Sequence, residues 1–172
     1  MFRIFNRIRS TGRLTEAVPH PDQAVAELGV ACQKEIAARF GGRLAIRMVD
    51  AGSCNGCELE MHAVNNSYYD IERFGIHFVA SPRHADLLLV TGVVSRNMQA
   101  ALKRTYDATP SPKLVVAMGD CAACGGEFGE SYASCGAVAN VLPVDAVIPG
   151  CPPTPLQLMQ GLLELLQDVP GQ

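Results

Sequence analysis

The sequence has no tryptophan, few aromatic residues (6%), few charged ones (18%) and no long apolar run. Its longest uninterrupted apolar stretch is residues 114–118, whereas a membrane-spanning helix needs about 20 residues, so we expect no transmembrane segment. The net charge of −3 gives no reason to expect nucleic-acid binding. Apolar residues nevertheless make up 48% of the 172 residues, which excludes a disordered chain and is enough for one core.

A secretory pattern is also missing. The first sixteen residues contain no apolar stretch of the kind that a secretory signal requires. The seven cysteines are an odd number, which excludes a complete disulfide framework. We therefore expect a reducing compartment, in which clustered cysteines bind metal or carry out redox chemistry.

Residues 1–20 form a basic N-terminal arm, with four arginines against one glutamate. Within it, Phe2, Phe5 and Ile8 recur at helical spacing. This pattern fits an amphipathic anchor for a membrane surface or an acidic partner. It fits a frayed, solvated terminus equally well. Residues 21–172 are expected to form a single domain.

Beyond the arm, short apolar runs alternate with helical stretches. We predict helices over residues 22–40, 58–74, 98–106 and 156–167, the last opened by a capping box at Thr154 and Gln157. We predict strands over residues 44–49, 76–79, 87–90, 114–118 and 144–148. Alternating strands and helices imply right-handed crossovers, and therefore an α/β fold with a central parallel sheet and helices on both faces.

Five cysteines fall in loops directly after predicted strands: Cys54, Cys57, Cys121, Cys124 and Cys151. In a parallel sheet these loops leave from the carboxyl edge, where open α/β sheets form their ligand sites. Neighbouring glycines allow close backbone approach, and the prolines at 152 and 153 stiffen the chain. A stiff surrounding suits a redox centre, because less protein has to rearrange when its charge changes.

Several interpretations of these cysteines remain open. A 4Fe–4S cluster takes four thiolates from separate loops. Structural zinc also accepts four, but ribbon-type sites place their second pair about 15–20 residues after the first, and here the gap is about 60. Dithiol chemistry explains Cys54 and Cys57 but leaves Cys121 and Cys151 unused. The thiols could also be unrelated packing residues, as we expect for Cys32 within its helix.

Four motifs carry a resemblance to a known family: CNGCELE at 54–60, SPRHAD at 81–86, MGDC at 118–121 with Gly125-Gly126, and PVD at 143–145 leading to PGCPP at 149–153. Between about residues 44 and 166 the chain resembles the small-subunit family shared by NiFe hydrogenases and the 20 kDa, cluster-N2 component of complex I. The resemblance implies a flavodoxin-like three-layer fold. It also implies one 4Fe–4S cluster at the carboxyl edge of the strands, held by Cys54, Cys57, Cys121 and Cys151.

Within this family the chain is most similar to the energy-converting membrane-bound hydrogenases of the formate hydrogenlyase and hydrogenase-4 types. It has Cys-x-x-Cys where the complex I component has adjacent cysteines, and from its short length we expect it to be without the long C-terminal extension of the uptake hydrogenases. The resemblance implies an electron-transfer subunit, not catalytic alone, that exchanges electrons with the NiFe site of a large subunit. A ferredoxin-like polyferredoxin subunit and membrane subunits would complete a peripheral complex on the cytoplasmic side of the membrane.

Two alternatives to the hydrogenase assignment stay open. One is the corresponding 20 kDa component of a complex I-like NADH or ferredoxin:quinone oxidoreductase. The other belongs to a different class: a thioredoxin-like dithiol oxidoreductase or a zinc-binding module.

Residues near the motifs are further candidates for a role at the site. The resemblance places a carboxylate at Glu60, where it would influence proton movement or the cluster potential, although Glu58 and Glu60 would also complement the positive end of a helix. The family's ligand directly follows Gly-x, which favours Cys121 over Cys124 and leaves Cys124 as a neighbouring or packing thiol.

Cys135 is expected to pack. Arg83 would either pair with a partner subunit, donate towards the cluster, or be a surface charge. His62 and His84 are expected at the surface or an interface.

Overall fold

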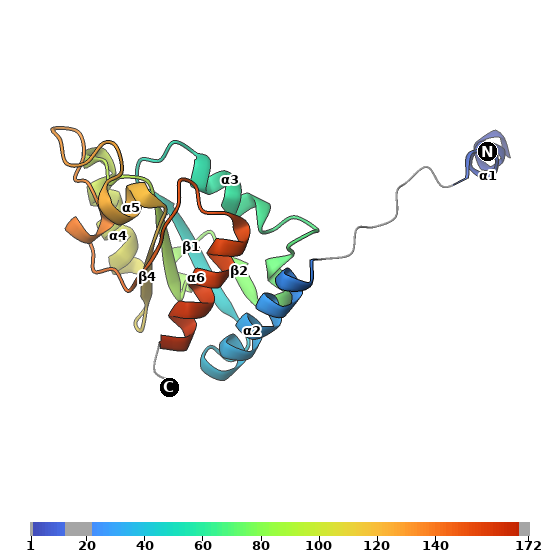
Figure 1. The fold of residues 1–172 in the computed structure, drawn as a ribbon, viewed down its shortest axis with the longest axis horizontal. Helices are drawn as coiled ribbons and strands as arrows, with labels where there is room; N and C mark the ends of the chain where they lie inside the picture. The colour runs from blue at the N-terminus through green and yellow to red at the C-terminus, as the bar shows by residue number, and fades with distance from the viewer. Residues whose placement is uncertain (1, 13–21, 169–172) are drawn as a thin grey trace.

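The computed structural model describes residues 2–12 and 22–168, so the predicted boundary between residues 20 and 21 lies outside the described residues. Helix α1 (Phe2–Thr11) lies apart from the body of the molecule (Figure 1). The helical spacing predicted for its apolar residues is confirmed.

The body is built on a five-stranded sheet. Its strands are β1 (Leu44–Asp50), β2 (Ile76–Phe78), β3 (Leu87–Thr91), β4 (Leu114–Met118) and β5 (Ala146–Ile148). All neighbours pair in parallel, in the order β2-β1-β3-β4-β5. This is the strand order of flavodoxin-like folds.

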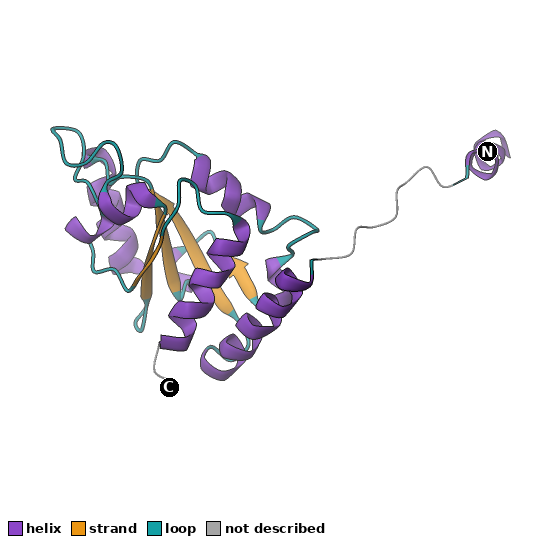
Figure 2. Ribbon diagram, in the orientation of Figure 1, coloured by secondary structure: helices purple, strands orange, loops and turns teal. Residues whose placement is uncertain are grey.

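Helices cover both faces of the sheet (Figure 2). On one face lie α2 (Gln23–Arg39), α3 (Gly56–Ala63) and α6 (Pro155–Asp168), and on the other lie α4 (Arg96–Ala108) and the short α5 (Asp120–Cys124). Three single turns of 3-10 helix complete the body, at Ile71–Phe74, Pro82–His84 and Val138–Asn140. The predicted three-layer α/β fold is confirmed.

Strand β3 shows why the layers hold together. Leu87 and Leu89 belong to the core on the α2 and α6 side, and Leu88 and Val90 to the core on the α4 side. All four side chains are fully buried. A central parallel strand is covered on both faces, and its sequence is therefore a continuous apolar run rather than an alternating one.

The ends of two helices follow the chemistry of their residues. Asp22 caps α2 by accepting a hydrogen bond from the Ala24 backbone N–H (3.2 Å). At the start of α6, the Thr154 hydroxyl accepts from the Gln157 backbone N–H (3.3 Å), while the Gln157 side chain accepts from the Thr154 backbone N–H (2.8 Å). This is the predicted capping box.

The predicted helix over residues 58–74 is wrong beyond Ala63. There the Asn66 side-chain oxygen accepts from the backbone N–H groups of Tyr68 (2.8 Å) and Tyr69 (3.1 Å), and Asp70 adopts a left-handed conformation with φ 46°. Short polar side chains of this kind compete with helical hydrogen bonds. The last strand is also shorter than predicted, because the Asp145 carboxylate accepts from the Val115 backbone N–H before β5 begins.

Among the residues that the structure describes, no helix combines the length and the apolar character needed to cross a bilayer.

Leu162 tests the core between α6 and the sheet. Its side chain is 1% exposed, and Leu162→Ala removes apolar surface and leaves a cavity. We expect the free energy of unfolding to fall by about 2–5 kcal/mol, measured by urea denaturation. Gln160→Ala, on the exposed side of the same helix, is the control and should change it by less than about 0.5 kcal/mol. Equal effects of the two variants would contradict this packing.

Candidate metal centre

Loops from three strands meet at the carboxyl edge of the sheet. The Gly119 backbone N–H donates to the Ile148 carbonyl (2.8 Å), and the Asp120 backbone N–H donates to the Gly150 carbonyl (2.9 Å). In return, the Gly150 backbone N–H donates to the Asp120 carboxylate (2.8 Å). These bonds fix the loop after β4 against the loop after β5, and thereby fix the segments that carry Cys121 and Cys151.

The sulfur atoms pack against glycine backbone. A β-carbon added at Gly119, whose φ is +87°, would lie 2.7 Å from Cys57 Sγ. One added at Gly126 would lie 2.8 Å from Cys121 Sγ. These two positions have room for sulfur only because they carry no side chain.

The loop after β1 joins the same place. A β-carbon at Gly56 would lie 3.5 Å from Cys54 Sγ and 3.7 Å from the Pro152 ring, so the Cys-x-x-Cys loop sits beside the segment that contains Cys151. The Cys57 thiol donates to the Met118 carbonyl at the end of β4 (3.9 Å). Residues far apart in the sequence thus share one site, as the strand order predicts.

Electrostatics couples the four thiols to one another. Burial is the main reason that the pKa of Cys57 rises to about 12, followed by the Glu58 carboxylate and the thiolates of Cys54, Cys121 and Cys151. Burial also raises the pKa of Cys121, with Cys151 as the next cause. Burial and neighbouring negative charge therefore favour the protonated thiols of Cys57 and Cys121, and a bound metal would compensate this cost while releasing their protons.

The donor set suits an iron–sulfur cluster. Within residues 2–12 and 22–168, no three His, Cys, Asp or Glu side chains converge as ligands of a single metal ion. A 4Fe–4S cluster takes one thiolate at each of its four irons, so its ligands surround a volume instead of converging on a point. Four thiols on three loops, three of them packed against glycine backbone, fit that requirement.

Of the other three cysteines, two are buried in the cores, and Cys124 lies close enough to Cys121 to contribute to its raised pKa. Cys32 is buried in the core beneath α2 and α6, where its thiol donates to the Met159 carbonyl (3.7 Å). Cys135 is buried in the core on the opposite face of the sheet, and packing is confirmed for both. Cys124 is exposed, and its thiol donates to the Asp120 carbonyl within α5 (3.2 Å).

Glu58 has a role that the sequence did not reveal. Its carboxylate is only 4% exposed and accepts hydrogen bonds from the Ser53 hydroxyl (2.7 Å) and from the Thr91 hydroxyl. Thr91 is the last residue of β3 and is fully buried. Glu58 therefore ties the Cys-x-x-Cys loop to the neighbouring strand, which is more than complementing the positive end of α3.

The remaining candidate residues are dispersed. Glu60 is half-buried on α3, three residues after Cys57. Arg83 and His84 are exposed in a turn that precedes β3. That turn lies at the amino edge of the sheet, a strand length of about 16 Å from the cysteine edge, so Arg83 does not donate towards the site.

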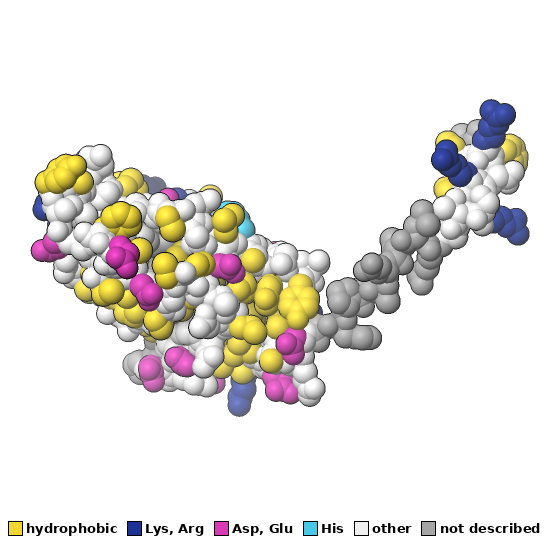
Figure 3. Space-filling model, turned by 45° about the horizontal axis from the view of Figure 1, so that its top comes forward, with side chains coloured by type: hydrophobic (Ala, Val, Ile, Leu, Met, Phe, Trp, Pro, Cys, Tyr) yellow, Lys and Arg dark blue, Asp and Glu magenta, His cyan; other side chains and the backbone are white. Residues whose placement is uncertain are grey.

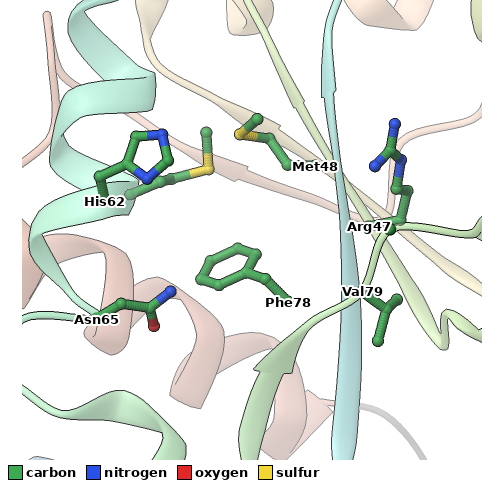
Figure 4. Close-up of a pocket in the computed structure, with 8 residues that line it drawn as sticks. Arg47, Met48, His62, Asn65, Phe78 and Val79 are labelled. Atoms are coloured by element: carbon green, nitrogen blue, oxygen red, sulfur yellow. The ribbon is translucent and has the colours of Figure 1, made fainter.

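A pocket lies between α3 and the strands β1 and β2 (Figure 4). Strand β2 ends at Phe78 while β1 continues to Asp50, and the space between them and α3 has a volume of about 250 Å³. Its walls are formed mainly by Met48, Met61, His62, Asn65 and Phe78. No sequence motif indicates this pocket, because it arises from the unequal lengths of two neighbouring strands.

Glu58→Ala tests the hydrogen-bonded tie between the loop and β3. The substitution leaves the buried Thr91 hydroxyl without its carboxylate acceptor, so we expect the free energy of unfolding to fall by about 1–3 kcal/mol in chemical denaturation. Glu60→Ala is the matched control on the same helix and should cost less than about 0.5 kcal/mol. If both variants are equally stable, Glu58 does not brace the loop.

Comparison with known proteins shows which family this chain resembles. Residues 54–165 match the family described as NADH ubiquinone oxidoreductase, 20 Kd subunit. Formate hydrogenlyase subunit 7 of Escherichia coli is 40% identical over 152 residues, which cover 87% of this chain and 58% of that protein. This chain thus spans less than two thirds of the length of that relative.

Two further relatives have similar levels of identity to this chain. The "Probable membrane-bound hydrogenase subunit mbhJ" of Pyrococcus furiosus is 44% identical over 121 residues, covering 70% of this chain and 72% of the relative. A component of the F(420)H(2) dehydrogenase of Methanosarcina mazei is 47% identical over 113 residues, covering 66% of this chain and 61% of the relative.

A solved structure has the same fold. A chain of the membrane-bound sulfane sulfur reductase, described as an archaeal respiratory membrane complex, superposes with a TM-score of 0.66 at 34% identity. The match covers 79% of this chain and 74% of that one. By the family match, the identities and the shared fold, the chain belongs to the family of the 20 kDa subunit of NADH:ubiquinone oxidoreductase.

Proposed function

We propose that the chain is the electron-transfer small subunit of a membrane-associated NiFe hydrogenase complex. The observation that carries the proposal is the meeting of four thiols, from loops after three different strands, at the carboxyl edge of the sheet. The names of the Escherichia coli and Pyrococcus furiosus relatives support a hydrogenase setting. In this role the chain is part of an oxidoreductase and has no catalytic activity alone.

Cys54, Cys57, Cys121 and Cys151 would hold one 4Fe–4S cluster, which supplies one-electron transfer when bound. Neighbouring residues of the chain would tune the reduction potential of this cluster. Cys57 is half-buried, and the neighbouring Glu58 adds a buried negative charge. Burial and nearby charge both tune the potential of such centres.

The site opens towards a partner on one side. Cys54 and Cys151 are exposed, whereas Cys57 and Cys121 are partly buried. We infer that the NiFe-carrying large subunit covers the exposed side, so that electrons cross a short distance. Cys32 and Cys135 lie in cores on opposite faces of the sheet and cannot join Cys124 in a second thiolate site, so nickel would be held by that partner.

The electron donor or acceptor would be a ferredoxin-like polyferredoxin subunit. Membrane subunits would hold the complex peripherally, on the cytoplasmic side. The solved relative in a respiratory membrane complex supports this kind of assembly.

A complex I-like oxidoreductase is the second candidate. The F(420)H(2) dehydrogenase relative favours it, and so does the pocket between α3 and β2. Met48, Met61 and Phe78 give that pocket apolar walls beside the polar side chains of Arg47, His62 and Asn65, a mixed lining that suits an electron acceptor with an apolar body and polar oxygens. The metal content of the co-purifying large subunit separates the two candidates, because only the hydrogenase requires nickel.

Substitution of the cysteines tests the ligand set. With the complex purified anaerobically through a tag on this chain, we expect about four irons and four sulfides to be attributable to it. Changing Cys54, Cys57, Cys121 or Cys151 singly to Ser should remove most of this iron and the corresponding electron paramagnetic resonance signal.

Cys124→Ser is the matched control and should retain both the iron and the signal. If Cys121→Ser keeps the cluster while Cys124→Ser loses it, the ligand assignment is reversed. Zinc without sulfide would indicate a zinc-binding module. A metal-free protein with a reversible Cys54–Cys57 disulfide would indicate a dithiol enzyme.

Glu60→Gln tests the proposed influence of this carboxylate on proton movement or cluster potential. Removal of a nearby negative charge should raise the reduction midpoint, by an amount on the order of tens of mV, and lower the turnover of the assembled complex. Glu72→Gln, an exposed carboxylate in the 3-10 turn at Ile71–Phe74, should change neither quantity. An unchanged midpoint and turnover in the Glu60 variant would remove Glu60 from the mechanism.

A further inference from the structure

Helix α1 exposes an unusual amount of apolar surface. None of its residues is buried, and it lies apart from the body of the molecule (Figure 1). Its large apolar side chains have exposed fractions of 63–88%: Phe2, Ile4, Phe5 and Ile8. Four exposed, large apolar side chains within ten residues form an apolar patch, and such patches on soluble proteins mark interaction sites.

The apolar side chains gather on one side of α1. At 100° per residue, Ile4, Phe5 and Ile8 fall within one sector, and Phe2 lies about 60° beyond Phe5, with Arg9 between them. The opposite side consists of polar residues: Arg3, Asn6, Arg7 and Ser10. The hydroxyls of Ser10 and Thr11 donate to the Arg7 carbonyl (3.0 and 2.6 Å), so the polar groups at the helix end are partly satisfied within the helix.

The charge of α1 is opposite to that of the rest of the chain. The helix contains three arginines and no acidic residue. Since the whole chain has a net charge of −3, the remainder has −6. Figure 3 shows this contrast, with only dark blue charged groups on the helix and mainly magenta ones on the visible face of the body.

We propose that α1 binds in the plane of an anionic lipid surface, with Ile4, Phe5 and Ile8 inserted among the acyl chains. A helix with a basic polar face and a Phe- and Ile-rich apolar face has the composition of interfacial helices. The aliphatic parts of Arg3, Arg7 and Arg9 can lie along the boundary while their guanidinium groups reach lipid phosphates. An acidic protein partner would pair with the arginines but would not by itself require the apolar side.

This inference does not depend on the cluster or on the hydrogenase assignment, so its test is separate. The full chain, purified anaerobically, is sedimented with phosphatidylcholine vesicles and with vesicles in which about one third of the lipid is phosphatidylglycerol. We expect binding to the anionic vesicles to be at least about tenfold tighter. Each arginine at an anionic surface contributes about fivefold, so Arg3→Gln with Arg7→Gln should lower this binding about 25-fold.

The apolar side is tested with Phe5→Ser combined with Ile8→Ser, which should weaken binding to anionic vesicles more than about tenfold. Asn6→Ser, on the opposite side of the same helix, is the matched control and should bind like the unchanged chain. The core should be unaffected in every variant, because α1 has no buried residue.

Two results would overturn the proposal. One is failure of the unchanged chain to sediment with anionic vesicles. The other is unchanged binding after loss of Phe5 and Ile8, which would leave only the arginines and point to an acidic protein partner.

Discussion

Burial of Cys57 and Cys121 beside other negatively charged groups is the constraint around which the carboxyl edge of this sheet is built. The high pKa of Cys57 expresses it, since burial and neighbouring negative charges both keep that thiol protonated. A bound cationic iron–sulfur core would offset these effects, but the sulfurs must already lie together for it to bind. The chain achieves this with main-chain hydrogen bonds between the loops after β4 and β5 and with glycines at the points of closest approach.

Glu58 adds a further negative group beside the thiols, which raises the pKa of Cys57. Its place is explained by what it holds, because the hydrogen bonds from Ser53 and Thr91 fasten the Cys-x-x-Cys loop to the end of β3. Those bonds offset the cost of burying the carboxylate. The same residue therefore stabilises the geometry of the site and supplies a fixed charge to it. A change at Glu58 would therefore alter both the position of the Cys-x-x-Cys loop and the charge beside the thiols.

The fold class and the place of the cysteines could be predicted from the sequence, because apolar runs followed by Gly- and Cys-containing loops leave little freedom in a parallel sheet. The end of α3 could not, because there the Asn66 side chain replaces helical hydrogen bonds. Nor did the sequence reveal the hydrogen bond between Thr91 and Glu58, since Thr91 ends β3 whereas Glu58 lies on α3, far from it along the chain. The position of Arg83 at the amino edge of the sheet likewise depends on the direction in which the chain enters β3, and the motif around Arg83 does not indicate that direction. Strand order was predictable and with it the meeting of the cysteine loops, whereas individual side-chain hydrogen bonds, such as those of Asn66 and Glu58, were not.

The cysteine loops and helix α1 are structurally independent parts of the chain. The sulfur sites belong to a body whose two cores pack on both faces of the sheet, so a displacement there would propagate through closely packed side chains. Helix α1 contributes no buried residue to those cores. Contacts made by α1 can therefore form or be lost without altering the spacing of the sulfurs. Substitutions in α1 are therefore expected to leave the loops unchanged, whereas a side chain added at Gly119 or Gly126 would meet a cysteine sulfur.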